Sequence, residues 1–311
     1  MKRVVFFVNQ LCGRGTTDMI YNYAKYNEVL LGNKSIIMTL TTPFHDHKHN
    51  QESIKTIQDE LEVVYVDGYD KIDTLKYNTD IFYVLKHGYN DGVVMSDVKN
   101  LIHSVFPSND PHGNEYFYIS KYCADMFRWN NWIEPIIDIK TLRHEENWRS
   151  KFGIKESDII FGRSGGYKQF DIQFVKDEVV EILKKNKNIH FWFTNTEKFY
   201  DHKNIKYFDF LDKRDLISFI NSCDCMLHAR KDGECFGLSI AEFSMCNKPV
   251  ITYTQSNHMA HTTYLSEFFG YDTQSELHKI LTTFHPDRSK NWNFYDGFSP
   301  NNIMQKFNRL L

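Results

Sequence analysis

Short apolar runs alternate with helical patterns along the whole chain. In the first half, Val4–Val8 is an apolar run between polar residues and predicts a buried strand, and another strand is expected at Leu101–Val105. The amphipathic segment Thr17–Leu31 predicts a helix, and a further helix is expected from about Ser120. Further strands are expected at Ser35–Leu40, Leu61–Val66, Asp80–Leu85 and Tyr116–Ile119. Such alternation is typical of βαβ units around a parallel sheet, so the sequence predicts an α/β fold.

The stretch Trp132–Thr141 (WIEPIIDIKT) has a proline between two apolar patches and predicts an interdomain linker. After it the alternation restarts. The strands expected in this half are Asp158–Gly162, Ile189–Phe193, Ile205–Phe208, Cys223–His228 and Pro249–Tyr253. The helices expected are Phe174–Lys185, Arg214–Asn221 and Leu238–Cys246. We therefore expect two domains, residues 1–137 and 138–294, followed by a terminal segment 295–311 with a short helix within Ser299–Leu311.

Composition narrows the class of protein. The length of 311 residues suits two domains of ordinary size, and 41% hydrophobic with 25% charged residues is typical of a soluble globular protein. A net charge of -3 gives no electrostatic reason to expect nucleic acid as a partner. No apolar run approaches the roughly 20 residues that span a bilayer, and the start MKRVVFFVNQ indicates a first strand and not a signal peptide.

Cysteine and histidine positions do not predict a metal site. The six cysteines form no paired zinc motif; Cys223 and Cys225 would share one face of a strand, but one pair cannot complete a zinc site. Buried thiols indicate a reducing compartment, and we expect a cytoplasmic protein. The run His45-Asp-His-Lys-His49 has metal-binding residue types, yet it falls where a loop is expected, and a solvated loop is the favoured interpretation.

The segment Met226–Tyr253 has the strongest pattern for chemistry. A strand ends near His228, a loop with glycine follows, and a helix begins close to Gly237. The crevice beyond the carboxyl ends of parallel strands is where such sheets bind ligands, and the first turn of a helix offers unpaired N–H groups. The amides of Phe236, Gly237 and Leu238 are therefore expected to form a cradle for a diphosphate.

Two carboxylates frame this cradle. Glu234 is expected in the loop before the helix, and Glu242 lies one turn beyond Leu238, where its side chain can share the face of the cradle. Carboxylates beside a diphosphate are suited to binding hydroxyl groups, one acid for a sugar and the other for a ribose. The alternative is that Glu242 is a solvated helix residue and Glu234 a loop acid that favours the helix N-terminus.

The same segment resembles the E-x7-E signature of retaining GT-B glycosyltransferases similar to family 4. It reads Glu234-Cys-Phe-Gly-Leu-Ser-Ile-Ala-Glu242, followed by a matching Asn-Lys-Pro-Val-Ile at 247–251. The resemblance implies two Rossmann-like domains that face a cleft, with the donor in the second domain. It also implies that Glu234 holds donor-sugar hydroxyls, that Glu242 holds the ribose, and that the cradle amides receive the distal phosphate.

A second segment, Ile159–Lys168 (IIFGRSGGYK), resembles the family's first strand and basic loop of the donor domain. By this resemblance Arg163 and Lys168 neutralise the diphosphate leaving group. Fixed cations of this kind lower the barrier for breaking a sugar–phosphate bond, because negative charge builds on the departing oxygen. Without the resemblance, both would be interpreted as surface charges.

The first half of the chain resembles the family mainly in its order of strands and helices. Gly13 and Gly15, in Cys12-Gly-Arg-Gly-Thr16, resemble the family's glycine loop and are candidate donor contacts; a tight strand-to-helix turn is the alternative. His103 occupies the place of the family's active-site histidine, with His87 as the rival, and either residue can instead be structural. His228 and Arg230 precede the signature and have no assigned role.

Together these features predict a retaining glycosyltransferase that moves a sugar from a UDP- or GDP-linked donor to a hydroxyl of a glycan or glycoconjugate. The resemblance implies an N-terminal acceptor domain and a terminal helix that crosses back onto it. No cofactor is expected and, since no Asp-x-Asp stands at a strand end, no obligatory metal. The alternatives are a GT-B-shaped nucleotide-sugar epimerase or phosphorylase, and a non-catalytic nucleotide-sugar- or glycan-binding protein. The loop Thr254–Thr263 departs from the family, which commonly has a glycine-rich turn there.

Overall fold

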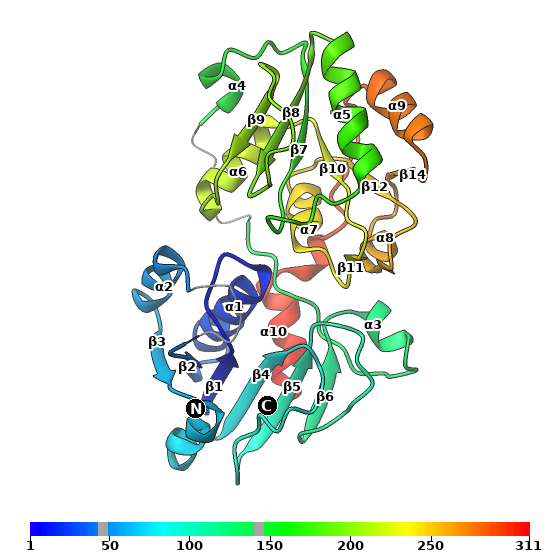
Figure 1. The fold of residues 1–311 in the computed structure, drawn as a ribbon. Coiled ribbons are helices and arrows are strands. Elements are labelled where there is room, and N and C mark those ends of the chain that lie inside the picture. Colours follow the sequence, from blue (N-terminus) through cyan, green and yellow to red (C-terminus); the bar gives the residue numbers. More distant parts are fainter. Residues whose placement is uncertain (43–48, 140–145) are drawn as a thin grey trace. The chain divides into compact units, whose positions relative to one another are not determined.

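The protein is described by a computed structural model that covers residues 1–42, 49–139 and 146–311 (Figure 1). The chain forms two compact units. We call Met1–Asp138 together with Phe298–Leu311 the N-terminal unit, and Ile139–Gly297 the C-terminal unit. The first boundary thus falls within the proline-containing stretch from Trp132 that predicts a linker.

The N-terminal unit is built on a six-stranded sheet in the order β3-β2-β1-β4-β5-β6, in which every neighbouring pair is parallel. Its strands are β1 (Arg3–Val8), β2 (Lys34–Leu40), β3 (Glu62–Val66), β4 (Ile81–Lys86), β5 (Lys99–Ser104) and β6 (Glu115–Tyr118). Its helices are α1 (Gly15–Val29), α2 (Gln51–Gln58), α3 (Lys121–Asp125) and α10 (Pro300–Asn308), with a 3-10 segment η1 at Tyr69–Asn78. The strands are buried along most of their length because helices and loops cover the sheet.

Helix α10, from the end of the chain, is part of the N-terminal unit. It packs against α1, and the ring of Phe307 lies 5.2 Å from that of Tyr23 and 5.7 Å from that of Tyr83. Lys306 Nζ is 2.7 Å from a carboxylate oxygen of the buried Glu134. The short 3-10 turn η2 (Asp296–Phe298) leads into this helix. The segment after residue 297 therefore completes the core of the first sheet.

The C-terminal unit repeats the same architecture. Its sheet has the order β14-β12-β10-β7-β8-β9 and is again parallel throughout. Its strands are β7 (Ile159–Arg163), β8 (Ile189–Thr194), β9 (Ile205–Phe208), β10 (Cys225–His228), β12 (Val250–Tyr253) and β14 (Phe269–Tyr271). Its helices are α4 (Trp148–Lys151), α5 (Gln173–Lys185), α6 (Lys213–Ser222), α7 (Leu238–Met245), α8 (Ala260–Tyr264) and α9 (Gln274–Thr283). A two-stranded parallel pair, β11 (Gly233–Glu234) and β13 (His258–Met259), lies outside the main sheet.

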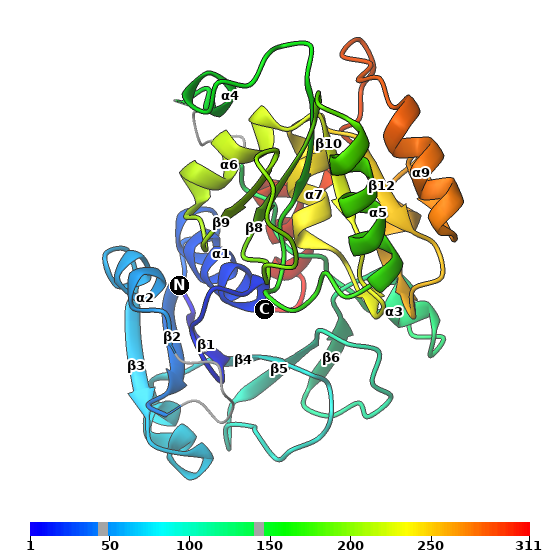
Figure 2. The same cartoon turned by 45° about the horizontal axis from the view of Figure 1, so that its top comes forward.

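Helices cover both faces of this second sheet. Helices α5 and α9 lie side by side, as Figures 1 and 2 both show, while α6 packs on β7, and α7 on β10 and β12. Side chains on the two faces of the sheet therefore meet different helices. Phe161 belongs to the core beneath α5, whereas Trp192 contacts Phe219 of α6. A β-carbon on Gly162 would stand 2.4 Å from Cys223 Sγ, so glycine is needed there for the close approach of sheet and helix.

Each sheet reverses its strand order at one point, between β1 and β4 in the first unit and between β7 and β10 in the second. Parallel sheets of this doubly wound kind bind ligands beyond the carboxyl ends of the two strands that flank the reversal. The predicted α/β class with two parallel sheets is confirmed. In the part of the chain that the structure describes, no helix combines the length and apolar character needed to cross a membrane.

Candidate functional site

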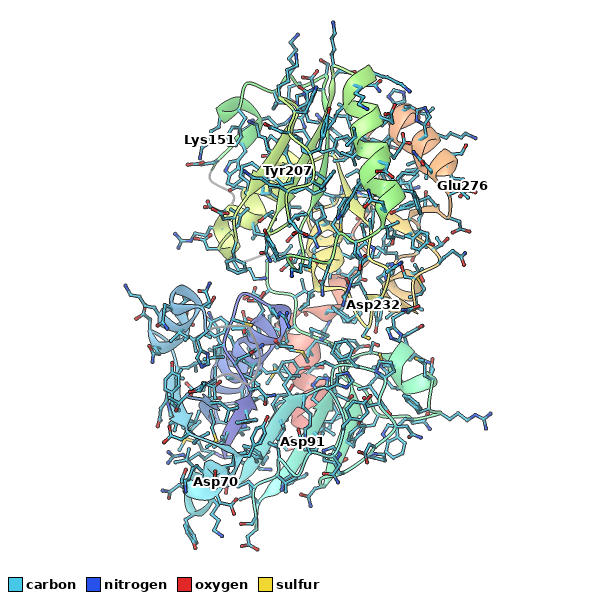
Figure 3. All side chains as sticks on the ribbon, in the orientation of Figure 1. Asp70, Asp91, Lys151, Tyr207, Asp232 and Glu276 are labelled. Atoms are coloured by element: carbon cyan, nitrogen blue, oxygen red, sulfur yellow. The ribbon has the colours of Figure 1, made fainter. Side chains whose placement is uncertain are left out.

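Charged and polar side chains gather where β7 and β10 end in the C-terminal unit. These two strands are neighbours across the reversal, with Met226 opposite Gly162 in register. Strand β7 ends at Arg163 and β10 ends at His228. The loop after β10 passes Arg230 and Asp232, which is labelled in Figure 3, before it enters β11 and then α7. Sheet topology therefore brings Arg163, His228 and the segment containing Glu234 to the expected ligand-binding edge.

Glu234 lies in the short strand β11 and not in the loop expected from the sequence. Strand β11 pairs with β13, Gly233 opposite His258 and Glu234 opposite Met259. This pairing needs glycine, since a β-carbon on Gly233 would stand 1.9 Å from the carbonyl oxygen of His258. The backbone that carries Glu234 is therefore fixed by a second segment of chain.

The carboxylate of Glu234 is held by two cationic or hydrogen-bonding partners. Arg230 Nη1 lies 3.0 Å from Oε2, and His228 Nε2 lies 3.4 Å from Oε1. Burial alone would raise the pKa of Glu234, but the hydrogen bond from His228 and the charge of Arg230 lower it to about 2. The side chain keeps 18% of its surface exposed. Glu234 is thus an ionised, oriented carboxylate that a ligand's hydroxyl groups can reach.

Behind this carboxylate lies a buried polar chain that the sequence analysis did not identify. His228 Nδ1 is 2.9 Å from Thr252 Oγ1, and the same hydroxyl is 3.0 Å from His261 Nε2. His228 and Thr252 face each other in register on β10 and β12, so strand alignment alone would have placed them together. His261, in contrast, comes from α8 in the segment that departs from the family pattern, and no sequence signal linked it to Glu234.

The predicted phosphate cradle is the start of helix α7. Gly237 occupies the N-cap position with φ of 92°, and no side chain caps the helix. A β-carbon at Gly237 would stand 3.4 Å from Cβ of Glu234, so the Glu234 side chain packs beside the helix N-terminus. Phe236 is buried and its ring packs on Tyr264 and Tyr295, while Leu238 is half-buried. The positive end of this helix dipole can receive an anion.

Glu242 is buried on α7 and its carboxylate forms an ion pair with Lys213 Nζ, from the first residue of α6. The interpretation of Glu242 as a solvated helix residue is therefore wrong. Lys213 is a partner that the sequence analysis missed, because it comes from a helix distant in sequence.

The two cations predicted for the leaving group have different environments. Arg163 is 4% exposed, and its guanidinium donates to the carbonyl oxygens of Asn195 and Gly166 and to Thr196 Oγ1 at 2.6–3.0 Å. Burial lowers its pKa to about 10, with Glu234 acting in the opposite direction. Lys168 is exposed and has no hydrogen-bond or ion-pair partner among the described residues. Arg163 therefore braces the glycine loop, whereas Lys168 is available to a ligand.

The two candidate histidines of the N-terminal unit also differ. His103 has no exposed surface, since Tyr83 Oη lies 2.7 Å from Nδ1 and the ring packs 4.4 Å from that of Phe117. This burial contradicts the expected contact of His103 with a donor or acceptor, because the side chain one residue before the end of β5 points into the core. His87, directly after β4, is exposed and stacked between Tyr89 and Phe106 at ring distances of 4.6 and 4.5 Å.

Gly13 and Gly15 form the turn that leads into α1. Arg14 N donates to the carbonyl oxygen of Cys12, and neither glycine has positive φ. This geometry is that of the tight strand-to-helix turn named as the alternative, although it leaves donor contact as a prediction. Residues 45–48 of the metal-like run lie outside the described residues. His49 accepts a hydrogen bond from Leu11 N, and the described ranges hold no cluster of three potential metal ligands.

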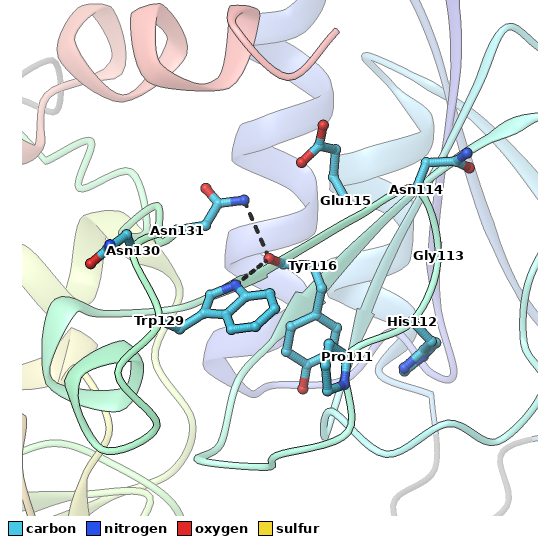
Figure 4. Close-up of a pocket in the computed structure, with 9 residues that line it drawn as sticks. All are labelled: Pro111, His112, Gly113, Asn114, Glu115, Tyr116, Trp129, Asn130 and Asn131. Carbon is cyan, nitrogen blue, oxygen red and sulfur yellow. Dashed lines mark hydrogen bonds between the residues drawn. The ribbon is translucent and has the colours of Figure 1, made fainter.

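A surface cavity of about 470 Å³ lies at the edge strand β6 of the N-terminal unit (Figure 4). Trp129 Nε1 and Asn131 Nδ2 both donate to the carbonyl oxygen of Tyr116. In Figure 4 the Glu115 side chain and the Tyr116 ring point to opposite sides of the strand, so these two side chains do not meet in the cavity. It also lies beside the beginning of β6 and not at the carboxyl ends of the strands. We do not consider it the functional site.

Comparisons with known proteins extend the description of the fold. No protein-family model matches the sequence, and no curated protein matches it. Solved structures do match over nearly the full length of both chains. Anabaena HepE in complex with UDP and glucose has 13% identity and a TM-score of 0.76, covering 99% of each chain. A glycosyltransferase from Rickettsia africae has 14% identity and a TM-score of 0.73, covering 99% of this chain and 97% of that one.

WaaG, a glycosyltransferase involved in lipopolysaccharide biosynthesis, has 12% identity and a TM-score of 0.64, covering 99% of this chain and 98% of that one. At such low identity the similarity describes the fold alone. The fold is nevertheless shared along nearly the whole chain. The protein has the GT-B fold.

Proposed function

We propose that this protein is a retaining glycosyltransferase that binds a nucleotide-diphosphate sugar at the carboxyl edge of the second sheet. The observation that carries the proposal is the pair Glu234 and Glu242, which flank the uncapped N-terminus of α7 beside the point where the strand order reverses. Similar structures of HepE contain UDP and UDP-glucose, which supports a uridine donor as the first choice.

Each part of this site suits one part of such a donor. The amides at Phe236, Gly237 and Leu238 would receive the distal phosphate, since the helix dipole favours an anion there. Glu242 would accept hydrogen bonds from the ribose hydroxyls, with Lys213 balancing its charge. Glu234 would accept them from the sugar hydroxyls, since Arg230 and His228 keep it ionised and oriented.

The proposed reaction retains the anomeric configuration. The bond from the anomeric carbon to the diphosphate oxygen breaks, a bond to the acceptor oxygen forms on the same face, and the acceptor's proton passes to the leaving phosphate. Lys168 and Arg230, with Arg163 behind them, would offset the charge that develops on that phosphate without a divalent metal. The proposed acceptor is a hydroxyl of a glycan or glycoconjugate, bound by the N-terminal unit near the exposed His87.

The first test is donor binding measured by thermal shift in EDTA, with UDP-sugars, starting from UDP-glucose, and GDP-sugars. A ligand at 100 times its Kd stabilises the folded state by about 2.7 kcal/mol, so the protein should show a clear rise in Tm with its donor. Glu242→Gln should abolish the rise. Glu181→Gln, on the exposed face of α5, is the matched control and should keep it. No shift with any nucleotide sugar would remove the basis of the proposal.

The second step separates the alternatives by their products. A transferase releases nucleotide faster when acceptor is added, and proton NMR of the product should show the anomeric configuration of the donor. An epimerase would change the sugar without an acceptor, and a non-catalytic protein would bind the donor without releasing nucleotide. An inverted product would overturn the retaining mechanism while leaving the donor site intact.

A further inference from the structure

An unbroken polar chain runs from the surface at Glu234 into the core of the C-terminal unit. Its links are Arg230 to Glu234 at 3.0 Å, Glu234 to His228 at 3.4 Å, His228 to Thr252 at 2.9 Å and Thr252 to His261 at 3.0 Å. Three separate elements, β10, β12 and α8, contribute its inner members. Thr252 and His261 have no exposed surface and His228 has 6%. Solvent therefore does not compete for these hydrogen bonds.

When His228 is neutral, the hydrogens in this chain follow from what each group can donate and accept. An ionised carboxylate only accepts, so His228 must carry a hydrogen on Nε2. A neutral His228 then accepts at Nδ1, and the only hydrogen that Thr252 can supply is its hydroxyl hydrogen. The lone pair of that hydroxyl oxygen accepts from His261 Nε2–H. The remaining ring nitrogen, His261 Nδ1, bears a lone pair and has no partner among the described residues.

The chain has a second arrangement when His228 is protonated. Both nitrogens of His228 would then be donors, so the His228–Thr252 bond would reverse and Thr252 would accept from His228. If Thr252 in turn donated its hydrogen to His261 Nε2, His261 would carry its own hydrogen on Nδ1, where the described residues provide no acceptor. The direction of the His228–Thr252 hydrogen bond is thus tied to the protonation of the ring that contacts Glu234. The other titratable groups that face this end of the chain are Arg230, Arg163 and Tyr295.

We propose that Thr252 and His261 are positioning residues of the donor site, which hold His228 as a neutral Nε2–H donor and thereby fix the orientation of the Glu234 carboxylate. This role rests on the proposed function, because a carboxylate of fixed orientation would distinguish sugars by the arrangement of their hydroxyl groups. Arg230 holds one oxygen and His228 the other, so the free lone pairs of both oxygens have defined directions. Neither Thr252 nor His261 would touch the donor.

The test compares Thr252→Val with Thr252→Ser. Valine keeps the branched shape and the strand preference of threonine but removes the hydroxyl, whereas serine keeps the hydroxyl and loses a methyl group. Ring nitrogens are observed by long-range 1H–15N NMR in 15N-histidine-labelled, ligand-free protein, with His228→Gln identifying the His228 signals. In the wild type, His228 should be a single neutral Nε2–H tautomer.

Thr252→Val should shift the His228 Nδ1 signal, because that nitrogen loses its donor, and should weaken donor affinity about tenfold, as loss of one hydrogen bond implies. Thr252→Ser should restore both. Should Thr252→Val fail to fold, His261→Leu against His261→Gln makes the same comparison, since glutamine can still donate to Thr252. Unchanged His228 signals with unchanged affinity in the loss variants, or failure of serine to rescue, would overturn the proposal.

The NMR measurement needs no donor, so the two proposals fail separately. A wild type that binds no nucleotide sugar but shows the predicted tautomer refutes the donor site, while the polar chain remains as described. A wild type that binds its donor with His228 in the Nδ1–H tautomer or as a cation refutes the positioning role and leaves the donor site standing.

Discussion

His103 and His261 are both fully buried, and burial lowers the pKa of each to about 3. The surroundings of the two rings nevertheless differ. His103 packs among the aromatic rings of Tyr23, Tyr83 and Phe117, with a single hydrogen bond to a phenol. His261 ends a polar chain that leads to Glu234. At the scale of one residue, the neighbours decide that the first histidine stabilises a core and the second orients a site.

The neutral His103 makes the stability of the N-terminal unit depend on pH. Its folded pKa of about 3 lies below the unfolded value of about 6.5, so the unfolded chain binds the proton more readily between these values. Stability is therefore fully present above pH 6.5 and is lost as pH falls, by about 1.4 kcal/mol per pH unit. Urea unfolding of the wild type between pH 6 and 4 should show this additional slope, and His103→Asn should lack it.

The exposed His285 provides the control for that measurement. His285→Asn should retain the slope of the wild type, since its ring meets water in both states. Equal slopes for the wild type and for His103→Asn would mean that His103 takes up a proton in the folded protein, and that water reaches the core around Tyr83.

At the scale of the elements, the paired strands β11 and β13 position Glu234, although each has only two residues. Gly233 permits that pairing, with φ of 68° and the carbonyl oxygen of His258 where a β-carbon would stand. Gly233→Ala should cost roughly 3 kcal/mol or more, because backbone strain adds to a clash that no side-chain movement relieves. It should also abolish the thermal shift with donor.

Gly32→Ala separates the cost of backbone strain from the cost of the steric clash in that prediction. Gly32 has a similar φ of 65°, but nothing lies within 4 Å of the position of its β-carbon. Its substitution should therefore cost only the backbone strain, about 1–2 kcal/mol, and leave donor binding unchanged. Similar losses of unfolding free energy in the two variants would show that the β11–β13 pair separates easily.

The limits of sequence interpretation follow from the same elements. Strands such as β4 and β8 consist mostly of large apolar residues, and their hydrophobic pattern is sufficient to predict them. Strands β11 and β13 are too short to show any period, and they exist only because two distant segments meet. Helix α9 was missed although Thr273 and Glu276 form a capping box, a signal that was present in the sequence.

The residues of the candidate site also differ in whether the sequence alone points to them. Glu234, Gly237 and Glu242 could be proposed from the sequence because their spacing within one segment carries the resemblance. Lys213 and His261 could not, because each comes from a different element: Lys213 meets Glu242, and His261 meets Thr252, only through tertiary packing. Polar residues buried by packing have no pattern in a single sequence, whatever their importance.

At the scale of the whole molecule, two sheets of the same strand order are each stabilised by their own core. Phe307 of α10 is fully buried against Phe6, Tyr23 and Tyr83 in the N-terminal unit. Phe307→Ala should cost about 3–5 kcal/mol there. Hydrogen exchange should accelerate in β1, β4 and α1, while β7, β10 and α7 remain protected and the donor-induced thermal shift persists.

Phe284→Ala provides the reciprocal control, because Phe284 is buried beside Phe161 in the C-terminal unit. Its exchange pattern should be the reverse, with faster exchange in β7 and β10 and protection retained in β1 and β4. Acceleration in both units by either variant would indicate that the units unfold as a single cooperative body.

The place of α10 has a consequence for how the protein is made. The ribosome releases the chain from its N-terminus, so the first sheet emerges early, yet the helix that covers Phe6, Tyr23 and Tyr83 is translated only after all of the C-terminal unit. A chain without α10 therefore has an uncovered apolar surface on the first sheet. Chains truncated before residue 298 should be bound by chaperones more strongly than the chain with α10, and α10 should remove that difference once it has left the ribosome.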